Sequence, residues 1–179
     1  SWLALRGRCS GCHSRISVQY PLIETSNAVL WLLVYGRFGF TPDSILGCLF
    51  VSVLLVASII DARTREIPPG TTIFVAVLGL LRLLLHLSQW KSSLLGLVCV
   101  SGVLLLVLLD SGGRAVGGGD IKLMAGTGLY LGFRLNILAF FLGCVLGAVI
   151  HLGRMKLAGA GRDLALGPYL SAGAVIALL

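Results

Sequence analysis

The residues best suited to chemistry in this sequence are two aspartates at the edges of apolar segments. Asp61 ends one such segment, and Asp120 begins another. Only seven of the 179 residues are acidic, and a carboxylate at a membrane edge is costly unless it has a partner or a function. Two carboxylates held together cannot easily both ionise, so one keeps a proton while the other acts as a base. Such a pair could activate water and polarise a carbonyl group, as an aspartic protease does.

Three glycines, Gly117, Gly118 and Gly119, come directly before Asp120. Glycine adopts backbone conformations that other residues avoid, and it lets another chain come close. We therefore expect a flexible rim at Asp120, along which a substrate backbone could lie as an extended strand. A rim of this kind could also move Asp120 toward Asp61 when a substrate arrives.

Membrane helices must position both aspartates, because the chain is 57% hydrophobic and only 12% charged, whereas soluble domains are roughly 25% charged. A membrane helix needs roughly 20 mostly apolar residues. Seven segments fit, three of them short: about 22–35, 42–60, 70–87, 92–109, 121–133, 135–152 and 166–179. The sequence predicts an all-α integral membrane protein. We expect a bundle of about seven transmembrane helices over residues 21–179, preceded by a short cytoplasmic cysteine-containing segment at 1–20.

The basic residues indicate which way the bundle faces. A formal net charge of +7 would also suit a nucleic-acid-binding protein, but the cations form no binding patch, so we expect the lipid bilayer and no nucleic acid as partner. With the N-terminus inside, Arg37, Lys91 and Arg134 lie outside, and the inner cations are Arg6, Arg8, Arg15, Arg63, Arg65, Arg114, Lys122, Arg154, Lys156 and Arg162. This positive-inside bias puts both aspartates on the cytoplasmic side.

Three charged residues allow simpler interpretations. Taken alone, Asp61 is an interfacial carboxylate that pairs with Arg63 or Arg65. Glu24 either caps the start of the first segment or faces a polar interior. Arg82 interrupts the third segment and either snorkels or pairs with a carboxylate on another helix.

Cys9 and Cys12 form a C-x-x-C with His13 beside it. A tight turn can aim both thiolates at one metal, but a structural zinc ion takes four ligands. The pair is therefore a zinc half-site, a redox pair or an unoccupied pair of cysteines.

These motifs, taken in order, resemble the type IV prepilin leader peptidase family of G-x-G-D intramembrane aspartic peptidases. The stretch Gly117 to Leu123 matches G-x-G-D, and Ile67-Pro68 follows six residues after Asp61. The resemblance covers nearly the whole chain and continues in Arg6-Gly7-Arg8-Cys9 with Cys12-His13, in Arg15-Ile16-Ser17 with Tyr20-Pro21-Leu22-Ile23-Glu24, and in Gly167-Pro168.

The resemblance implies a multi-pass enzyme of the bacterial inner membrane, with a cytoplasmic N-terminus. It would cut the basic leader from type IV prepilins or type II secretion pseudopilins at the cytoplasmic face, with Asp61 and Asp120 as the catalytic pair. Proteolysis needs no cofactor, whereas N-methylation of the new N-terminus would use S-adenosylmethionine, and zinc would bind at Cys9 and Cys12. The residues expected to bind substrate or shape the loop are Gly117, Gly118, Gly119, Lys122, Pro68 and Glu24.

Two departures from the family pattern affect these expectations. Family members usually carry a further N-terminal membrane segment and a first C-x-x-C. This chain begins at Ser1, so we expect a fragment or a trimmed chain in which zinc binding and methylation are in question and the aspartates are intact. Pro69 stands where an Asp or Asn commonly follows the Ile-Pro.

Two functions of other classes stay open at this point. A small transporter could bind a cation between Asp61 and Asp120, and a catalytically inactive relative could serve as an assembly or docking component. A presenilin-like protease is disfavoured, because in that family a tyrosine precedes the first aspartate and here Ile60 does.

Overall fold

The computed structural model describes residues 7–8, 10–113, 116–158 and 165–179, without the side chains of 154 and 156–158. These residues form seven α-helices and one short 3-10 helix. In chain order they are α1 (Gln19–Phe38), α2 (Pro42–Thr64), α3 (Pro69–Leu85), η1 (Leu87–Gln89), α4 (Trp90–Ser111), α5 (Gly118–Leu131), α6 (Phe133–Ala158) and α7 (Gly167–Leu178). Each predicted apolar segment coincides with one helix to within a few residues; the largest difference is that α6 ends at Ala158 rather than at 152.

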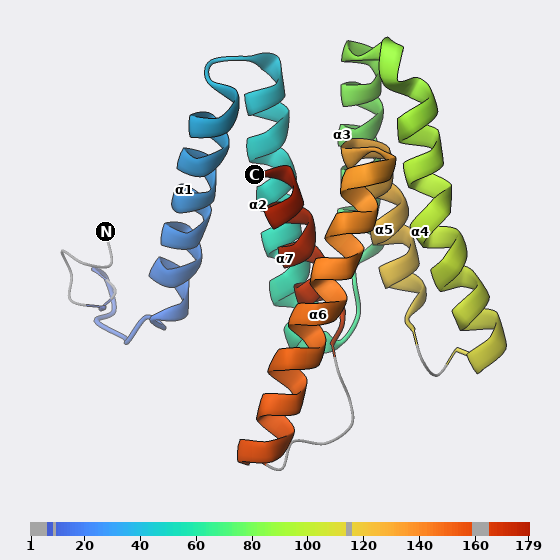
Figure 1. Ribbon diagram of the computed structural model, residues 1–179. Coiled ribbons are helices and arrows are strands. Elements are labelled where there is room, and N and C mark those ends of the chain that lie inside the picture. The colour runs from blue at the N-terminus through green and yellow to red at the C-terminus, as the bar shows by residue number, and fades with distance from the viewer. Residues whose placement is uncertain (1–6, 9, 114–115, 159–164) are drawn as a thin grey trace.

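The helices run up and down between two ends of the bundle (Figure 1). At the lower end of that view α2, α4 and α6 end, and α3, α5 and α7 begin. This is the alternation that the charge pattern predicts. Residues 10–18, which precede α1, also lie toward the lower end.

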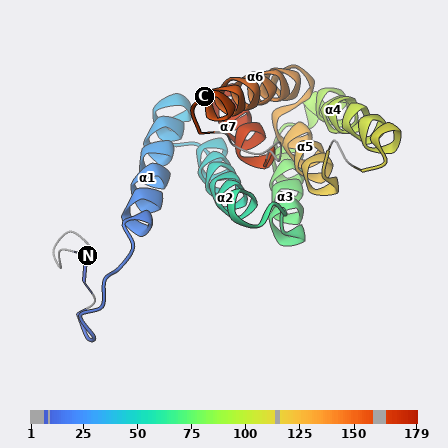
Figure 2. The same cartoon turned by 90° about the horizontal axis from the view of Figure 1, so that it is seen from below.

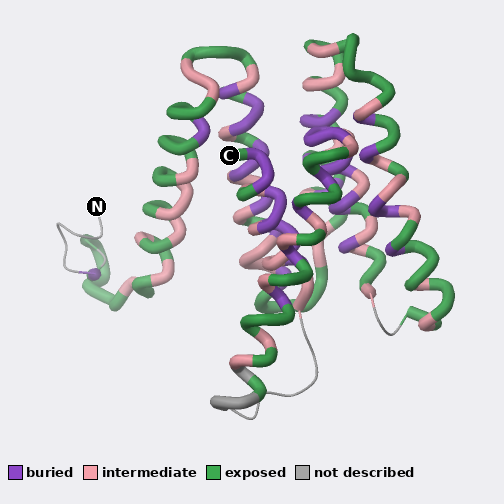
Figure 3. Tube along the Cα trace, viewed as in Figure 1, coloured by how far each residue is buried: buried purple, intermediate pink, exposed green. Residues whose placement is uncertain are grey.

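The two shortest helices lie inside the bundle, and α1 lies at its edge (Figure 2). Eight of the 14 residues of α5 and seven of the 12 residues of α7 are buried. In α1 the one buried residue of 20 is Val34, so this helix is green and pink over most of its length in Figure 3. Neighbouring helices therefore surround much of α5 and α7, so that protein rather than lipid shields their backbones. This burial accounts for their short length.

Three helical stretches of the described chain are long and apolar enough to cross a membrane: Pro42–Thr64, Leu87–Ser111 and Phe133–Gly153. Pro69–Leu85 and Gly167–Leu178 are apolar but shorter. The prediction of an all-helical membrane protein is confirmed at this level, and the number of crossing helices stays a prediction.

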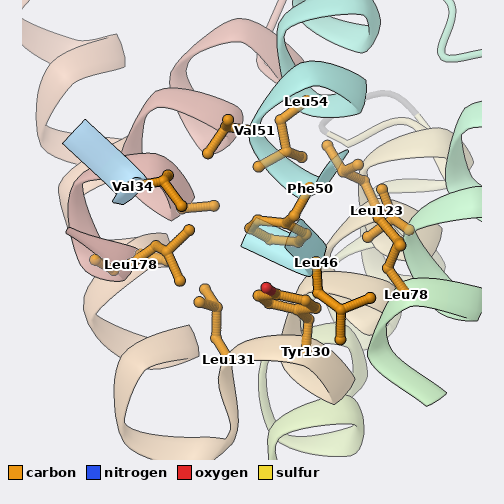
Figure 4. Close-up of a cluster of buried hydrophobic side chains, with 14 residues drawn as sticks. Val34, Leu46, Phe50, Val51, Leu54, Leu78, Leu123, Tyr130, Leu131 and Leu178 are labelled. Atoms are coloured by element: carbon orange, nitrogen blue, oxygen red, sulfur yellow. The ribbon is translucent and has the colours of Figure 1, made fainter. Parts of the chain in front are cut away.

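The main core joins α2 to α5 (Figure 4). Phe50 and Tyr130 stack with their ring centroids 4.0 Å apart and their planes 8° from parallel. Around them pack the buried aliphatic side chains Val34, Leu46, Val51, Leu54, Leu78, Leu123, Leu131 and Leu178. This packing fixes α2 and α5, the helices that carry the two aspartates, against each other.

A polar cluster ties the same helices together near the upper end of the bundle. Arg82 of α3 lies 3.6 Å from the Asp43 carboxylate of α2, donates a 2.9 Å hydrogen bond to the Tyr130 carbonyl of α5, and covers the Tyr130 ring. His86 lies 2.9 Å from the same carboxylate. The expectation that Arg82 pairs with a carboxylate on another helix is thus confirmed.

Close glycine contacts bring the remaining helices together. A Cβ at Gly143 of α6 would lie 3.0 Å from the Leu170 Cα atom of α7, and a Cβ at Gly96 of α4 would lie 2.5 Å from the Gly128 carbonyl of α5. Small residues permit such approaches between membrane helices. Asn136, fully buried, spans this region by donating to the Gly96 carbonyl at 2.9 Å.

Candidate functional site

Asp61 occupies the last turn of α2, where it is only 5% exposed. Its Oδ2 atom accepts a 3.0 Å hydrogen bond from the backbone N–H of Gly167, which begins α7. Asp61 makes no ion pair with any residue that the structure describes, and Arg63 donates instead to the Gln19 side chain. The interpretation of Asp61 as an arginine-paired interfacial carboxylate is therefore wrong.

The backbone of Gly167 lies so close to the Asp61 carboxylate that no side chain would fit between them. A Cβ built at this position would lie 2.6 Å from Asp61 Oδ2 and 2.9 Å from its Cγ, which is closer than non-bonded atoms pack. The start of α7 can therefore bind the carboxylate through its amide because residue 167 has no side chain. The positive end of the α7 dipole also favours an anion at this point.

Asp120 lies in the first turn of α5, ahead of the apolar stretch that begins at residue 121, and is 8% exposed. Its Oδ2 atom accepts a 3.3 Å hydrogen bond from the Gly117 N–H. Its Oδ1 atom is buried and has no hydrogen-bond partner among the described residues. One carboxylate oxygen of Asp120 thus lacks a hydrogen bond from the described residues that would stabilise it as an anion.

The two carboxylates interact electrostatically. Burial and, after it, the charge of Asp61 raise the pKa of Asp120 to about 6, against the smaller opposing effect of the Gly117 amide. The start of α7 brings the sites together, since α7 packs against both α2 and α5. The arrangement can therefore hold one proton between an acid and a base, as hydrolysis of an amide requires.

The three glycines before Asp120 have ordinary backbone conformations. None of them has a left-handed conformation, and Gly118 and Gly119 belong to the first turn of α5 rather than to a loop. Close approach does apply at Gly119, where a Cβ would lie 3.0 Å from the Ile67 Cβ, whereas nothing lies within 4 Å of a Cβ at Gly118. The backbone at these glycines thus has no conformation that only glycine adopts. The tight contact of Gly119 with Ile67 is a constraint within the chain itself, and the flexible rim along which a substrate strand lies stays a prediction.

The other residues predicted to bind substrate or shape the loop are more scattered. Pro68 immediately precedes α3, and its carbonyl accepts a 3.1 Å hydrogen bond from Thr71 N–H. Lys122 is exposed on α5 and lines a shallow groove with residues of α3 and α4. Glu24 is exposed in the second turn of α1. Because α1 begins at Gln19, Glu24 does not cap the start of that helix, and the capping interpretation is wrong.

The cysteine pair is described in part. Cys9 lies outside the described residues, and Cys12 is exposed with its sulfur 3.0 Å from the Ser14 hydroxyl. Around it, Arg8 and Arg15 form an antiparallel bridge. No group of three His, Cys, Asp or Glu side chains could hold a metal in the part of the chain that the structure covers. Cys12 and His13 alone do not complete the four ligands of a structural zinc site.

Sequence reasoning missed the contribution of Gly167 to the site. The Gly167-Pro168 pair was visible at the start of the last apolar segment, but its contact with Asp61 joins residues 106 positions apart. The signal that could have found it is a glycine placed at the start of a helix next to a proline, a point where backbone N–H groups are unpaired and open to an anion.

Comparison with known proteins gives two family matches. Residues 48–152, more than half of the chain, match the model of the type IV leader peptidase family. Residues 1–38 match the bacterial peptidase A24 N-terminal domain.

The chain is also similar to individual proteins named prepilin leader peptidase/N-methyltransferase. It is 33% identical over its whole length to the one from Pseudomonas putida, of which it covers 65%, and 33% identical to the one from Bacillus subtilis, of which it covers 73%. It is 34% identical over 96% of its length to the one from Neisseria gonorrhoeae, of which it covers 61%. The chain thus spans about two thirds of the length of these relatives. No solved structure matches it.

Proposed function

Because the chain belongs to the type IV leader peptidase family, we propose that it is a membrane aspartic endopeptidase. Its substrates are type IV prepilins or type II secretion pseudopilins, from which it removes the basic leader at the cytoplasmic face. The observation that carries this proposal is the pair of buried carboxylates, Asp61 and Asp120, whose charges interact at one end of the bundle. The family match favours neither a cation transporter nor an inactive docking component.

We assign Asp120 the role of acid and Asp61 the role of base. Burial and the charge of Asp61 raise the pKa of Asp120 to about 6, and its Oδ1 atom has no hydrogen-bond partner in the described structure. Each carboxylate accepts one backbone N–H, from Gly167 at 3.0 Å for Asp61 and from Gly117 at 3.3 Å for Asp120, so the unpaired Oδ1 atom is what distinguishes Asp120. This difference in surroundings matches the difference that two cooperating carboxylates need.

The reaction then follows from the two protonation states. Asp61 takes a proton from water as the oxygen attacks the scissile carbonyl carbon, and Asp120 gives its proton to the carbonyl oxygen. When the C–N bond breaks, Asp61 passes its proton to the leaving amine and the tetrahedral intermediate returns a proton to Asp120. One water is consumed, and both carboxyl groups end as they began.

We further propose that all seven helices lie in the bacterial inner membrane with the N-terminus in the cytoplasm. The three helical stretches long enough to cross support this, as does the common end at which α2 ends and α5 and α7 begin. The positive-inside distribution of the cations points the same way.

Fewer observations support the remaining site predictions. Gly119 packs closely against Ile67, and Pro68 follows Ile67 in the sequence. We propose that these residues shape the approach to Asp120 together with Gly117 and Gly118. Substrate contacts of Glu24 and Lys122, zinc at Cys9 and Cys12, and methyl transfer from S-adenosylmethionine stay predictions. No step of the proteolysis depends on them.

A cleavage assay tests the proposal. The purified chain is incubated with a synthetic prepilin and labelled S-adenosylmethionine, and the products are analysed by mass spectrometry. Asp61→Asn and Asp120→Asn should each lower the cleavage rate by about 10³-fold or more, since each removes a proton-transfer group. Asp110→Asn is the matched control, because Asp110 is exposed at the same end of the bundle and should be replaceable without loss. Cleavage at the normal rate by either of the first two variants would disprove the two-aspartate mechanism.

A further inference from the structure

Asn136 takes no part in the proposed reaction, yet it is fully buried where α4, α5 and α6 meet. Its side-chain nitrogen donates to the Gly96 carbonyl of α4 at 2.9 Å and to the Met124 carbonyl of α5 at 3.3 Å. Its Oδ1 atom accepts a 3.1 Å hydrogen bond from the Thr127 hydroxyl of α5. Both N–H bonds and the oxygen of this amide are therefore paired, and the pairs join three helices.

Beside this amide the backbones of α4 and α5 touch. A Cβ at Gly128 would lie 2.2 Å from the Gly96 carbonyl oxygen and 2.6 Å from Asn136 Nδ2. A contact between glycines has no side chains that interlock, and apolar packing is not directional. Hydrogen bonds depend on both distance and angle, so a shift of α5 along its axis by one residue, roughly 1.5 Å, would break those of Asn136. This amide therefore fixes the position of α5 along its axis.

The depth of α5 in the membrane depends on such contacts. A long apolar helix takes its depth from the match between about 20 residues and the hydrocarbon core. The stretches of α2, α4 and α6 that are long enough for this are Pro42–Thr64, Leu87–Ser111 and Phe133–Gly153. Helix α5 has only 14 residues and is largely buried, so protein contacts rather than lipid must set its depth. Asn136 joins it to two of the long helices.

The depth of α5 sets the position of Asp120. Met124, which accepts from Asn136, follows Asp120 by four residues, or about one turn. The Asp120 carboxylate accepts a hydrogen bond from Gly117 in the same segment, and its Oδ1 atom has no partner among the described residues. A second polar contact to α5, from Arg82 to the Tyr130 carbonyl, lies ten residues beyond Asp120. The contact of Asn136 is thus the nearer of the two to the carboxylate.

We propose that Asn136 is a positioning residue of the peptidase, which holds Asp120 of α5 at the depth of Asp61 of α2. Asn136 touches neither carboxylate and acts through the Met124 carbonyl, while Thr127 supports it by pairing the amide oxygen. The inference rests on the proposed function, because two carboxylates at one depth are what allows both to act on one bond.

Cleavage kinetics provide the first test. Asn136→Leu keeps the approximate size of the side chain and removes its hydrogen bonds. We expect kcat for a prepilin to fall about tenfold, with KM changed by less than about twofold, because Asn136 acts on the carboxylate rather than on substrate binding. Thr127→Val, which removes one hydroxyl group, should lower kcat about threefold. Thr127→Ser keeps that hydroxyl and should restore it.

Ser101→Ala is the matched control. Ser101 of α4 is also buried, but its hydroxyl donates to the Leu97 carbonyl of its own helix. Its removal deletes a buried hydrogen bond without affecting α5, so kcat should stay normal.

Infrared titration of Asp120 provides a second readout that needs no cleavage. The charge of Asp61 raises the pKa of Asp120, so Asp61→Asn should lower it in the otherwise unaltered chain. In an Asn136→Leu background the same substitution should lower this pKa by about half as much or less, because the two carboxylates no longer lie at one depth. In a Ser101→Ala background the full change should remain.

A lower unfolding temperature for Asn136→Leu, with kcat and the interaction of the carboxylates unchanged, would show that Asn136 only stabilises the bundle and would overturn the inference. If Asn136→Leu does not fold, Thr127→Val decides: normal values of both readouts overturn the inference, and losses that Thr127→Ser restores support it. A weakened interaction of the carboxylates in a chain that cuts no prepilin in any form would instead reject the peptidase and keep the positioning role.

Discussion

The two ends of this bundle hold carboxylates in opposite circumstances. At the upper end Asp43 is neutralised by Arg82 and lies against His86. At the lower end Asp61 and Asp120 have one backbone amide each and the charge of the other. Both clusters join α2 to a neighbouring helix, yet only the first satisfies its charges. A buried carboxylate that remains without a cation among the described residues, next to a second one, is typical of a functional site rather than of a structural contact.

Removing the cation from the upper cluster makes it resemble the lower cluster and tests whether the two ends have separate roles. Arg82→Met leaves Asp43 without its cation and the Tyr130 carbonyl without a donor. We expect the free energy of unfolding to fall by about 2 kcal/mol, below the roughly 3–5 kcal/mol of a fully buried pair because both side chains are partly exposed. Thermal unfolding in detergent measures this loss. Arg82→Lys, which keeps the charge, should lose less.

Cleavage is the second readout for the same variants. The folded fraction of Arg82→Met should cleave a prepilin at the rate of the unaltered chain, because the upper cluster takes no part in the reaction. Loss of cleavage without loss of stability would show that the two ends do not have separate roles.

Gly167→Ala disturbs the lower cluster alone. The new methyl group would lie 2.6 Å from Asp61 Oδ2, so that the carboxylate must move and lose its amide. We expect the cleavage rate to fall about tenfold to 30-fold, which corresponds to about 1.4–2 kcal/mol in the barrier. Steady-state kinetics measures it. A normal rate would mean that the Gly167 amide does not position Asp61.

Gly119→Ala should have the smallest effect of these changes. Its methyl group would lie 3.0 Å from the Ile67 Cβ, whereas Gly118→Ala meets nothing within 4 Å. A shift of a few tenths of an ångström at Asp120 should slow cleavage only about threefold, or about 0.7 kcal/mol. Gly118→Ala in the same assay is the control and should cleave normally. Equal effects of the two variants would instead point to flexibility of the whole glycine run, as the sequence predicted.

Much of the fold could be predicted because its signal is local. Seven apolar segments and the distribution of cations placed each helix and put Asp61 and Asp120 at one end. The sequence does not explain why a segment such as 121–133 is short. In the structure the corresponding helix, α5, is largely buried among other helices (Figure 3).

The parts that could not be predicted depend on contacts between distant residues. Nothing near Arg82 in the sequence indicates that Asp43 is its partner, and nothing near Asp61 indicates the Gly167 amide. The glycines before Asp120 illustrate a different failure. Glycine is compatible with several roles, and only the packing of Gly119 against Ile67 shows that close approach, rather than an unusual backbone conformation, is the one in use.

The central claim is that Asp61 and Asp120 act on each other, and the titration of Asp120 tests it most directly. The carboxyl C=O stretch in infrared difference spectra of the unaltered chain against Asp120→Asn reports its protonation as pH is varied. We predict a pKa of about 6, which falls in an Asp61→Asn background yet stays above the ordinary value, because burial is the larger cause of the shift. A pKa that Asp61→Asn leaves unchanged would show that the two carboxylates are independent and would contradict the account.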